Sequence, residues 1–270
     1  MSVAPALKIA VAGAGGRMGG TVTAALAEAR DLTLSGALLV PGDPREGHAV
    51  GALPGLPASS VCFTSDPAGA IRDADVVIDF SLPDGTMTLL EACLDAGLPL
   101  VCGVTGLDEA RRDRLRAAGG QIPVLLAANM SVGVNLMIHL SRVAAAALPG
   151  FDAEISEIHH RFKRDAPSGT ALAIGEAVDQ GRGGGSGSET GRGPGDGPRE
   201  AGAIGYASLR AGDVVGEHTL LLAGDGERLE ITHRAGDRMA FAAGALRAAR
   251  WLAGRPPGFY GMGDVLGLTV

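Results

Sequence analysis

Aromatic residues and cysteines are scarce in this chain of 270 residues. Phenylalanine, tryptophan and tyrosine make up only 3% of the sequence, too little for the aromatic platforms on which single-stranded nucleic acids stack. The three cysteines, Cys62, Cys93 and Cys102, are too few and too scattered for a disulfide framework or a paired-cysteine zinc site. We therefore expect buried, reduced thiols and a cytoplasmic location.

Excess positive charge and long apolar runs are also missing. The formal net charge is −7, which argues against general nucleic-acid binding, so any anionic ligand has to be held by a local site. No uninterrupted apolar run approaches the length of about 18 residues that a membrane span requires. The first residues lack the charged segment and apolar core of a signal peptide. We expect neither a nucleic-acid partner nor a membrane partner.

Strand-like apolar runs alternate with helical patterns through the first half of the chain. The runs cover residues 7–13, 32–39, 74–81, 99–106 and 122–131. Apolar strands that alternate with helices are typical of a parallel sheet covered on both faces. The pattern predicts an α/β fold with a Rossmann-like dinucleotide-binding domain, in which ligands bind beyond the carboxyl ends of the strands.

The pattern changes after about residue 130. Strand-like segments joined by short glycine–aspartate turns predict a second α+β domain, built on a mixed or antiparallel sheet. We expect residues 1–130 and 241–270 to form the first domain and residues 131–240 the second. The glycine-rich stretch 181–197 offers no core-forming side chains, and we expect it to be a mobile loop.

A glycine motif, "VAGAGGRMGG", joins the first predicted strand to the following helix. Glycine permits a tight turn there and lets backbone N–H groups approach a pyrophosphate at the positive end of the helix. Met18 stands where the common pattern has its third glycine, but Gly13, Gly16 and Gly19 keep a regular spacing. The motif and its context predict dinucleotide binding.

The end of the second strand leaves the coenzyme open. An acidic residue there usually binds the ribose hydroxyls of NAD, whereas a basic residue binds the 2′-phosphate of NADP. Val40-Pro41 carries neither charge, and Asp43 and Arg45 lie a few residues too far along. We expect NADH or NADPH as the coenzyme, with no preference indicated.

The stretch "EIHHRFKRDAPSGT" contains two of the six histidines, His159 and His160. Adjacent residues of a strand point to opposite faces, so we expect no metal site, although a solvated basic run is one reading. Ser168 is a natural N-cap, and the following N–H groups of Gly169 and Thr170 favour an anion at the helix terminus. The segment predicts a receptor for a carboxylate-bearing small molecule.

Acid–base groups accompany this predicted anion site. Neighbouring cations lower the pKa of a histidine and substrate carboxylates raise it, and either shift leaves the imidazole able to donate a proton near neutral pH. Glu157 could orient the imidazole of His159 or face solvent, and both alternatives stay open. Asp165 is expected to fix the turn, and His218 and His233 are expected to be structural.

Several blocks together carry a family resemblance: "VAGAGGRMG", "IDFSLPDGT", "GVTG", "AANMSVGVNLM" and "EIHHRFKRDAPSGTALAIGEA". With them the chain resembles the 4-hydroxy-tetrahydrodipicolinate reductase (dihydrodipicolinate reductase) family of bacterial lysine biosynthesis, over nearly its whole length. The resemblance implies NAD(P)H-dependent reduction of 4-hydroxy-tetrahydrodipicolinate, with loss of water, in the diaminopimelate route. It also implies a homotetramer built through the sheet of the second domain.

The resemblance also implies roles for particular residues. His159 would be the acid–base group and Lys163 a second proton donor. His160, Gly169 and Thr170 would contact the substrate carboxylates, with Ser168 beside them. The implied coenzyme contacts are Gly13, Ala14, Gly15, Gly16, Arg17, Met18, Gly103, Val104, Thr105, Ala127, Ala128, Asn129 and Met130. Another nucleotide-dependent dehydrogenase, such as an aspartate dehydrogenase, and a catalytically silent NAD(P)H-binding protein are the alternatives.

Overall fold

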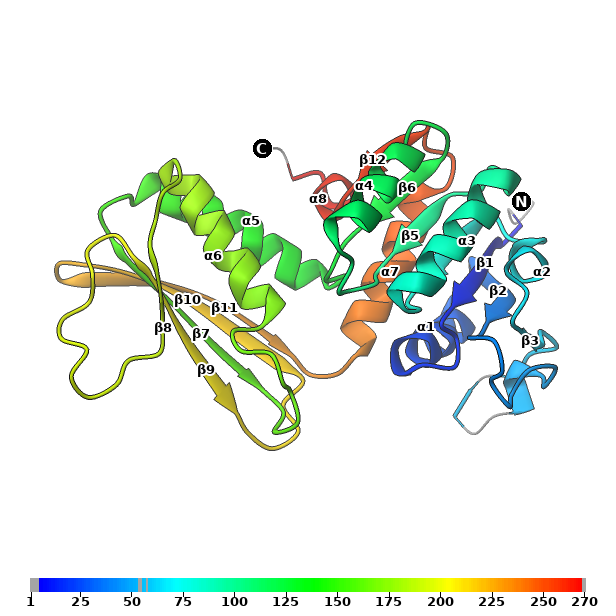
Figure 1. Cartoon of the computed structure of the whole chain (residues 1–270), viewed down its shortest axis with the longest axis horizontal. Helices are drawn as coiled ribbons and strands as arrows, with labels where there is room; N and C mark the ends of the chain where they lie inside the picture. The colour runs from blue at the N-terminus through cyan, green and yellow to red at the C-terminus, as the bar shows by residue number, and fades with distance from the viewer. Residues whose placement is uncertain (1–4, 53–54, 57, 269–270) are drawn as a thin grey trace. The chain divides into compact units, whose positions relative to one another are not determined.

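The computed structural model describes residues 5–52, 55–56 and 58–268. The chain divides into two compact units, each with its own sheet (Figure 1). Unit 1 contains residues 1–131 and 239–270, and unit 2 contains residues 132–238. Within the described ranges, no helix is long and apolar enough to cross a membrane.

Unit 1 is built on a parallel sheet of seven strands in the order β12-β6-β5-β4-β1-β2-β3. The strands are β1 (Leu7–Ala12), β2 (Leu32–Leu38), β3 (Phe63–Thr64), β4 (Val76–Asp79), β5 (Leu100–Cys102), β6 (Pro123–Leu126) and β12 (Gly258–Tyr260). The five expected strands are the five central ones. The short edge strands β3 and β12 were not predicted.

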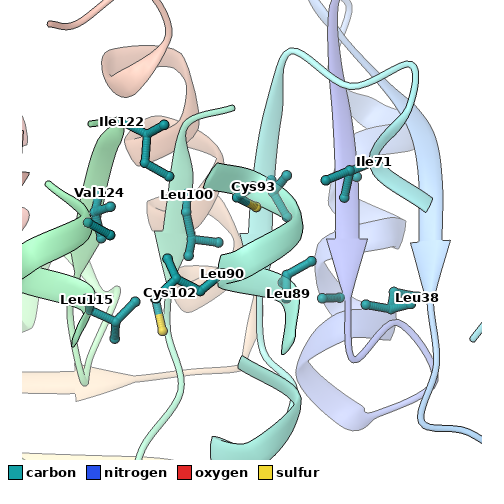
Figure 2. Close-up of a cluster of buried hydrophobic side chains, with 14 of the residues drawn as sticks. Leu38, Ile71, Leu89, Leu90, Cys93, Leu100, Cys102, Leu115, Ile122 and Val124 are labelled. Carbon is teal, nitrogen blue, oxygen red and sulfur yellow. The ribbon is translucent and has the colours of Figure 1, made fainter. Parts of the chain in front are cut away.

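Helices cover both faces of this sheet. They are α1 (Arg17–Glu28), α2 (Pro67–Ile71), α3 (Pro83–Ala96), α4 (Glu109–Ala118), α7 (Met239–Leu252) and α8 (Met262–Leu266), with a short 3₁₀ helix at Val50–Ala52. Alanine, leucine and valine side chains of the strands pack with α2, α3 and α4 in one cluster (Figure 2). Small residues line the buried side of α7, which packs against α1 and the central strands. This is the predicted doubly covered α/β arrangement.

The cysteines differ in their surroundings. Cys93 and Cys102 are buried in the cluster of Figure 2, and burial together with nearby Asp79 raises the pKa of each thiol to about 12. Both therefore stay protonated and unreactive. Cys62 is exposed, so the expectation that it is buried is wrong. It follows a short loop rather than a core strand, which explains the difference.

Unit 2 is built on a mixed sheet of five strands in the order β11-β10-β7-β9-β8. The strands are β7 (Asp152–His159), β8 (Ser188–Thr190), β9 (Ile204–Arg210), β10 (Gly216–Gly224) and β11 (Glu227–Ala235). The first three strands of that order pair antiparallel, and the β7-β9-β8 pairs are parallel. Helices α5 (Val132–Ala147) and α6 (Gly169–Arg182) pack on one face and bury an apolar cluster. The mixed sheet agrees with the sequence prediction.

The glycine-rich stretch 181–197 is not entirely a loop. Strand β8 lies inside it and pairs in parallel with β9. Just beyond it, Arg199 donates to Asp152 at 2.6 Å and to Glu154 at 3.2 Å, both on β7. The prediction of a loop over 181–197 is therefore wrong at residues 181–182, which end α6, and at β8, where pairing with a distant strand supplies order that local composition does not indicate.

Candidate active site

Polar residues replace apolar ones at one end of the buried face of the unit 2 sheet. Alternate residues of β7 face the helices, and after two apolar positions this row ends in Glu157 and His159. Strand register places His218 of β10 beside Glu157 and Arg210 of β9 beside His159. Four ionisable side chains from three strands thus gather where the apolar core stops.

Glu157 stands at the centre of this cluster. Its side chain is 1% exposed, and its two carboxylate oxygens accept hydrogen bonds from both Nη atoms of Arg210 at 2.9 Å. It also accepts from the backbone N–H of Ser168 at 3.3 Å. Burial alone would raise the pKa of Glu157, but the bonds from Arg210 and His159 outweigh it and hold the pKa below its ordinary value. The carboxylate is therefore ionised, and the solvent-facing alternative is wrong.

His159 is held by this carboxylate. Its Nδ1 lies 2.5 Å from a Glu157 oxygen, so Nδ1–H is the donor and Nε2 is the atom left to exchange a proton. Nε2 faces Gly216, where an added Cβ would lie only 3.0 Å away. Burial lowers the pKa of His159; Glu157 opposes this shift, and the nearby charges of Lys163 and Arg210 add to it. An anion bound nearby would push the pKa back up.

The turn after β7 carries the next two predicted site residues. His160 is half-buried, and its carbonyl accepts from the backbone N–H of Lys163 at 3.1 Å. The Lys163 ammonium pairs with Asp165 at 2.9 Å, and the Asp165 carbonyl accepts from Arg210 at 2.5 Å. Asp165 therefore ties the turn to the buried cluster, as its expected structural role requires.

Helix α6 begins at the same place. Ser168 is its N-cap and is 2% exposed, and its Oγ accepts from the backbone N–H of Ala171 at 3.2 Å. The same Oγ lies 3.0 Å from Nε2 of His218. The Ser168 hydroxyl is thus occupied in holding the helix end. Gly169, the first helical residue, is exposed, and a first-turn N–H has no acceptor inside its helix.

His218 is closer to this site than its expected structural role suggested. It is 4% exposed and meets the His159 ring edge to face, with 5.1 Å between the ring centres. Burial lowers its pKa to about 4, with the charge of His159 as a smaller cause, so His218 is neutral near pH 7. Together with Arg210 it is a residue of the site that the sequence did not single out. The one feature of the sequence that could have indicated His218 is its position among the alternate, mostly apolar residues of β10 that face the helices.

The candidate coenzyme loop lies in unit 1, between β1 and α1. Gly13 has φ 70°, and a Cβ on it would stand 2.4 Å from the carbonyl oxygen of Phe80. A Cβ on Gly19 would stand 2.1 Å from the carbonyl oxygen of Gly13, so side chains are excluded from both positions. Helix α1 starts at Arg17, and its N-cap, Gly16, supplies no side-chain hydrogen bond. Its first N–H groups can therefore bind an anion, and this cradle fits a pyrophosphate.

The other candidate coenzyme residues follow β5 and β6. The carboxyl ends of β1, β4, β5 and β6 share one edge of the parallel sheet. The backbone N–H of Gly103 donates to the carbonyl oxygen of Asp79 at 2.9 Å, and that of Ala127 donates to the carbonyl oxygen of Cys102 at 3.0 Å. These bonds fix both segments at that edge. Val104 and Met130 are buried, whereas Thr105 and Ala128 are exposed and Asn129 is half-buried.

Comparison with known proteins identifies the family. Residues 7–130 match the model for "Dihydrodipicolinate reductase, N-terminus", and residues 133–266 match the model for "Dihydrodipicolinate reductase, C-terminus". The chain is 48% identical over 265 residues to 4-hydroxy-tetrahydrodipicolinate reductase of Thiobacillus denitrificans, covering 97% of this chain and 99% of that protein. It is 50% identical over 264 residues to the protein of the same name from Alkalilimnicola ehrlichii, covering 97% and 99%.

A solved structure shares the fold. Dipicolinate-bound dihydrodipicolinate reductase from Paenisporosarcina sp. TG-14 matches with a TM-score of 0.78 and 22% sequence identity, covering 96% of this chain and 99% of that chain. With the family models and the curated relatives, these findings place the whole described architecture in one family. The chain belongs to the dihydrodipicolinate reductase family of NAD(P)H-dependent oxidoreductases.

Proposed function

We propose that this protein reduces 4-hydroxy-tetrahydrodipicolinate to tetrahydrodipicolinate, with loss of water, in the diaminopimelate route of lysine biosynthesis. The observation that carries the proposal is the buried pair of His159 and Glu157 beside the amino end of α6. An acid–base group and a carboxylate receptor then lie together in a chain of this reductase family.

NADH or NADPH supplies the hydride when bound. The loop Gly13, Ala14, Gly15, Gly16, Arg17 and Met18 would hold the pyrophosphate with backbone N–H groups at the start of α1. The segments Gly103–Thr105 and Ala127–Met130 would line the nicotinamide side, largely with backbone atoms. Their place at the carboxyl edge of the sheet supports this assignment.

The substrate's carboxylates would be received at the start of α6. The N–H groups of Gly169 and Thr170 lie at the positive end of a helix of 14 residues, where an anion is favoured. His160 would add a hydrogen bond from the neighbouring turn. Ser168 would act by capping the helix and fixing its direction, because its hydroxyl is already bonded to Ala171 and His218.

His159 would supply the proton. A carbon–carbon double bond that accepts hydride at one carbon needs a proton at the next. The substrate's negative charge raises the pKa of His159, and the imidazolium then donates from Nε2 while Glu157 stabilises the charge through Nδ1. Lys163 would be the second donor in this turn. Arg210 would keep Glu157 ionised and in place.

The two units would divide these tasks. Residues 1–130 and 241–270 would form the dinucleotide-binding domain, and residues 131–240 would bind substrate and build a homotetramer. The sheet face of unit 2 away from its helices has an exposed Leu209 and a bonded Thr219–Thr232 pair at 3.0 Å, which supports a subunit contact there. We also propose a cytoplasmic location, where this small-molecule pathway runs.

The test is turnover of the pure protein. The substrate is formed in the cuvette by the preceding synthase, and oxidation of NADH or NADPH is followed by loss of nicotinamide absorbance. Oxidation that depends on the substrate supports the proposal. Normal coenzyme binding without turnover would contradict it and favour a silent coenzyme-binding protein. Turnover with aspartate instead would favour an aspartate dehydrogenase.

A further inference from the structure

The end of β2 offers no acidic residue to a coenzyme ribose. Leu39 is 5% exposed and therefore buried, and Val40, whose side chain is apolar, is 61% exposed. In Rossmann-like domains a carboxylate at this point accepts the ribose hydroxyls of NAD, and an arginine nearby accommodates the extra phosphate of NADP. The group that selects the coenzyme in this chain therefore has to come from another segment.

Arg45 folds back in this way. Its Nη1 donates to the carbonyl oxygen of Gly15 at 2.9 Å, which places the guanidinium directly on the glycine loop. A Cβ on Gly15 would stand 2.3 Å from Nη2 of Arg45, so only glycine leaves room for the arginine there. A cation from the segment after β2 thus lies against the loop expected to bind the pyrophosphate.

Asp43 holds this arginine with both carboxylate oxygens, so its carboxylate is not the group that would bind a ligand. Its Oδ1 accepts from the backbone N–H of Arg45 at 3.0 Å and from Nε at 2.8 Å, and its Oδ2 accepts from Nη2 at 2.5 Å. These bonds from Arg45 lower the pKa of Asp43 to about 2. The Asp43 side chain is 9% exposed and that of Arg45 is 34% exposed. The pair therefore presents its guanidinium, not its carboxylate, to solvent.

The hydrogen bonds of Arg45 also indicate that the guanidinium is the group of this pair that can bind a ligand. An arginine has five N–H donors, and the bonds to Asp43 and Gly15 use three of its side-chain N–H groups. Two remain for a ligand. The next acid along the chain, Glu46, is already bonded to Ser65 at 2.5 Å. Arg17, exposed at the first position of α1, adds a second cation beside the loop.

We propose that Arg45, held in place by Asp43, binds the 2′-phosphate of NADPH and makes this chain prefer NADPH to NADH. The proposal rests on the proposed coenzyme site and names the residue that selects between its two coenzymes. A guanidinium donates paired hydrogen bonds to the charged oxygens of a phosphate. The neutral ribose hydroxyl of NADH accepts weaker hydrogen bonds from it. Asp43 acts as a positioning residue through its bonds to Arg45.

Calorimetric titration of the full chain tests the proposal without catalysis. The wild type should bind NADPH at least about tenfold more tightly than NADH, and adenosine 2′,5′-bisphosphate more tightly than adenosine 5′-monophosphate. Arg45→Ala should weaken NADPH binding by about 10–100-fold and change NADH binding by less than about threefold. Asp43→Asn should weaken NADPH binding less. Arg112→Ala, which removes an exposed arginine of α4, is the matched control and should change neither.

The outcomes separate this proposal from the function itself. Equal binding of the two coenzymes by the wild type, tighter binding of NADH, or an equal loss of both in Arg45→Ala would overturn the role of Arg45. The two adenosine phosphates need no variant, so equal affinity for them overturns it even if Arg45→Ala fails to fold. Discrimination between the phosphates without turnover of the dicarboxylate would overturn the proposed function and leave the role of Arg45 intact.

Discussion

Replacing Glu157 with glutamine removes the charge on which the proposed proton donor depends, while it preserves the size of the side chain. The carboxylate accepts from Arg210 twice and from His159 once. A glutamine has one oxygen and one NH₂ group, so at least one of these donors would face another donor. His159 would lose its orientation, and its pKa would fall further because Glu157 is the group that raises it.

The magnitude follows from these contacts. A positioned general acid contributes roughly 10²–10⁴-fold to a rate, so kcat should fall by about 10²-fold or more. The substrate KM should change by less than about threefold, because Glu157 is buried and reaches the start of α6 only through the backbone N–H of Ser168, whose side chain keeps the helix capped. Leaving a buried charge without its partner lowers the free energy of unfolding by roughly 3–5 kcal/mol. For Glu157→Gln we expect a loss of about 2 kcal/mol, because Arg210 is 19% exposed and still donates to the carbonyl oxygens of Leu209 and Asp165.

Steady-state kinetics across pH is the assay. The basic limb of the kcat/KM profile should move to lower pH in Glu157→Gln, since the His159 cation is the active form and its pKa drops. Arg199→Gln is the matched control: it breaks ion pairs with Asp152 and Glu154 at the other end of β7 and should lower stability alone. An unchanged kcat with an unmoved profile would refute the orienting role of Glu157.

Three further outcomes follow from the site. Lys163→Gln should lower kcat by roughly 10²-fold or more in steady-state assays, and a rise in KM alone would make it a binding residue. Gly216→Ala should lower kcat without changing coenzyme affinity, because its Cβ would lie 3.0 Å from Nε2 of His159. Burial lowers the pKa of His218 from 6.5 to about 4. The stability that depends on a neutral His218 is therefore fully present above about pH 6.5, and it is lost as the pH falls toward 4. In urea unfolding, this loss should reach about 3 kcal/mol at most, and His218→Asn should flatten the pH dependence.

The central strands of unit 1 could be predicted because each one is a local apolar run. Strands β3 and β12 could not, because two or three residues carry no periodicity. Their pairing is set by neighbours far along the chain, such as Ala37 beside Phe63 and Val124 beside Phe259. Strand β8 in the glycine-rich stretch escaped prediction for the same reason.

The candidate site divides in the same way. The turn from His159 to Thr170 is continuous in sequence, so its histidine, lysine and helix cap could be recognised together. Arg210 and His218 reach the cluster only through the register of β9 and β10 against β7. Sequence spacing does not contain that register. The same argument applies to Arg45, whose return to Gly15 depends on a turn fixed by Asp43.

We propose that the buried imidazole of His159 transfers the proton during substrate-dependent oxidation of a reduced nicotinamide coenzyme. The most direct measurement compares kcat for wild type and His159→Gln, with the 4-hydroxy substrate formed in situ and either coenzyme at saturation. We expect turnover by the wild type, a kcat lower by about 10²-fold or more in the variant, and an unchanged coenzyme affinity. Equal kcat values for the two proteins would contradict it.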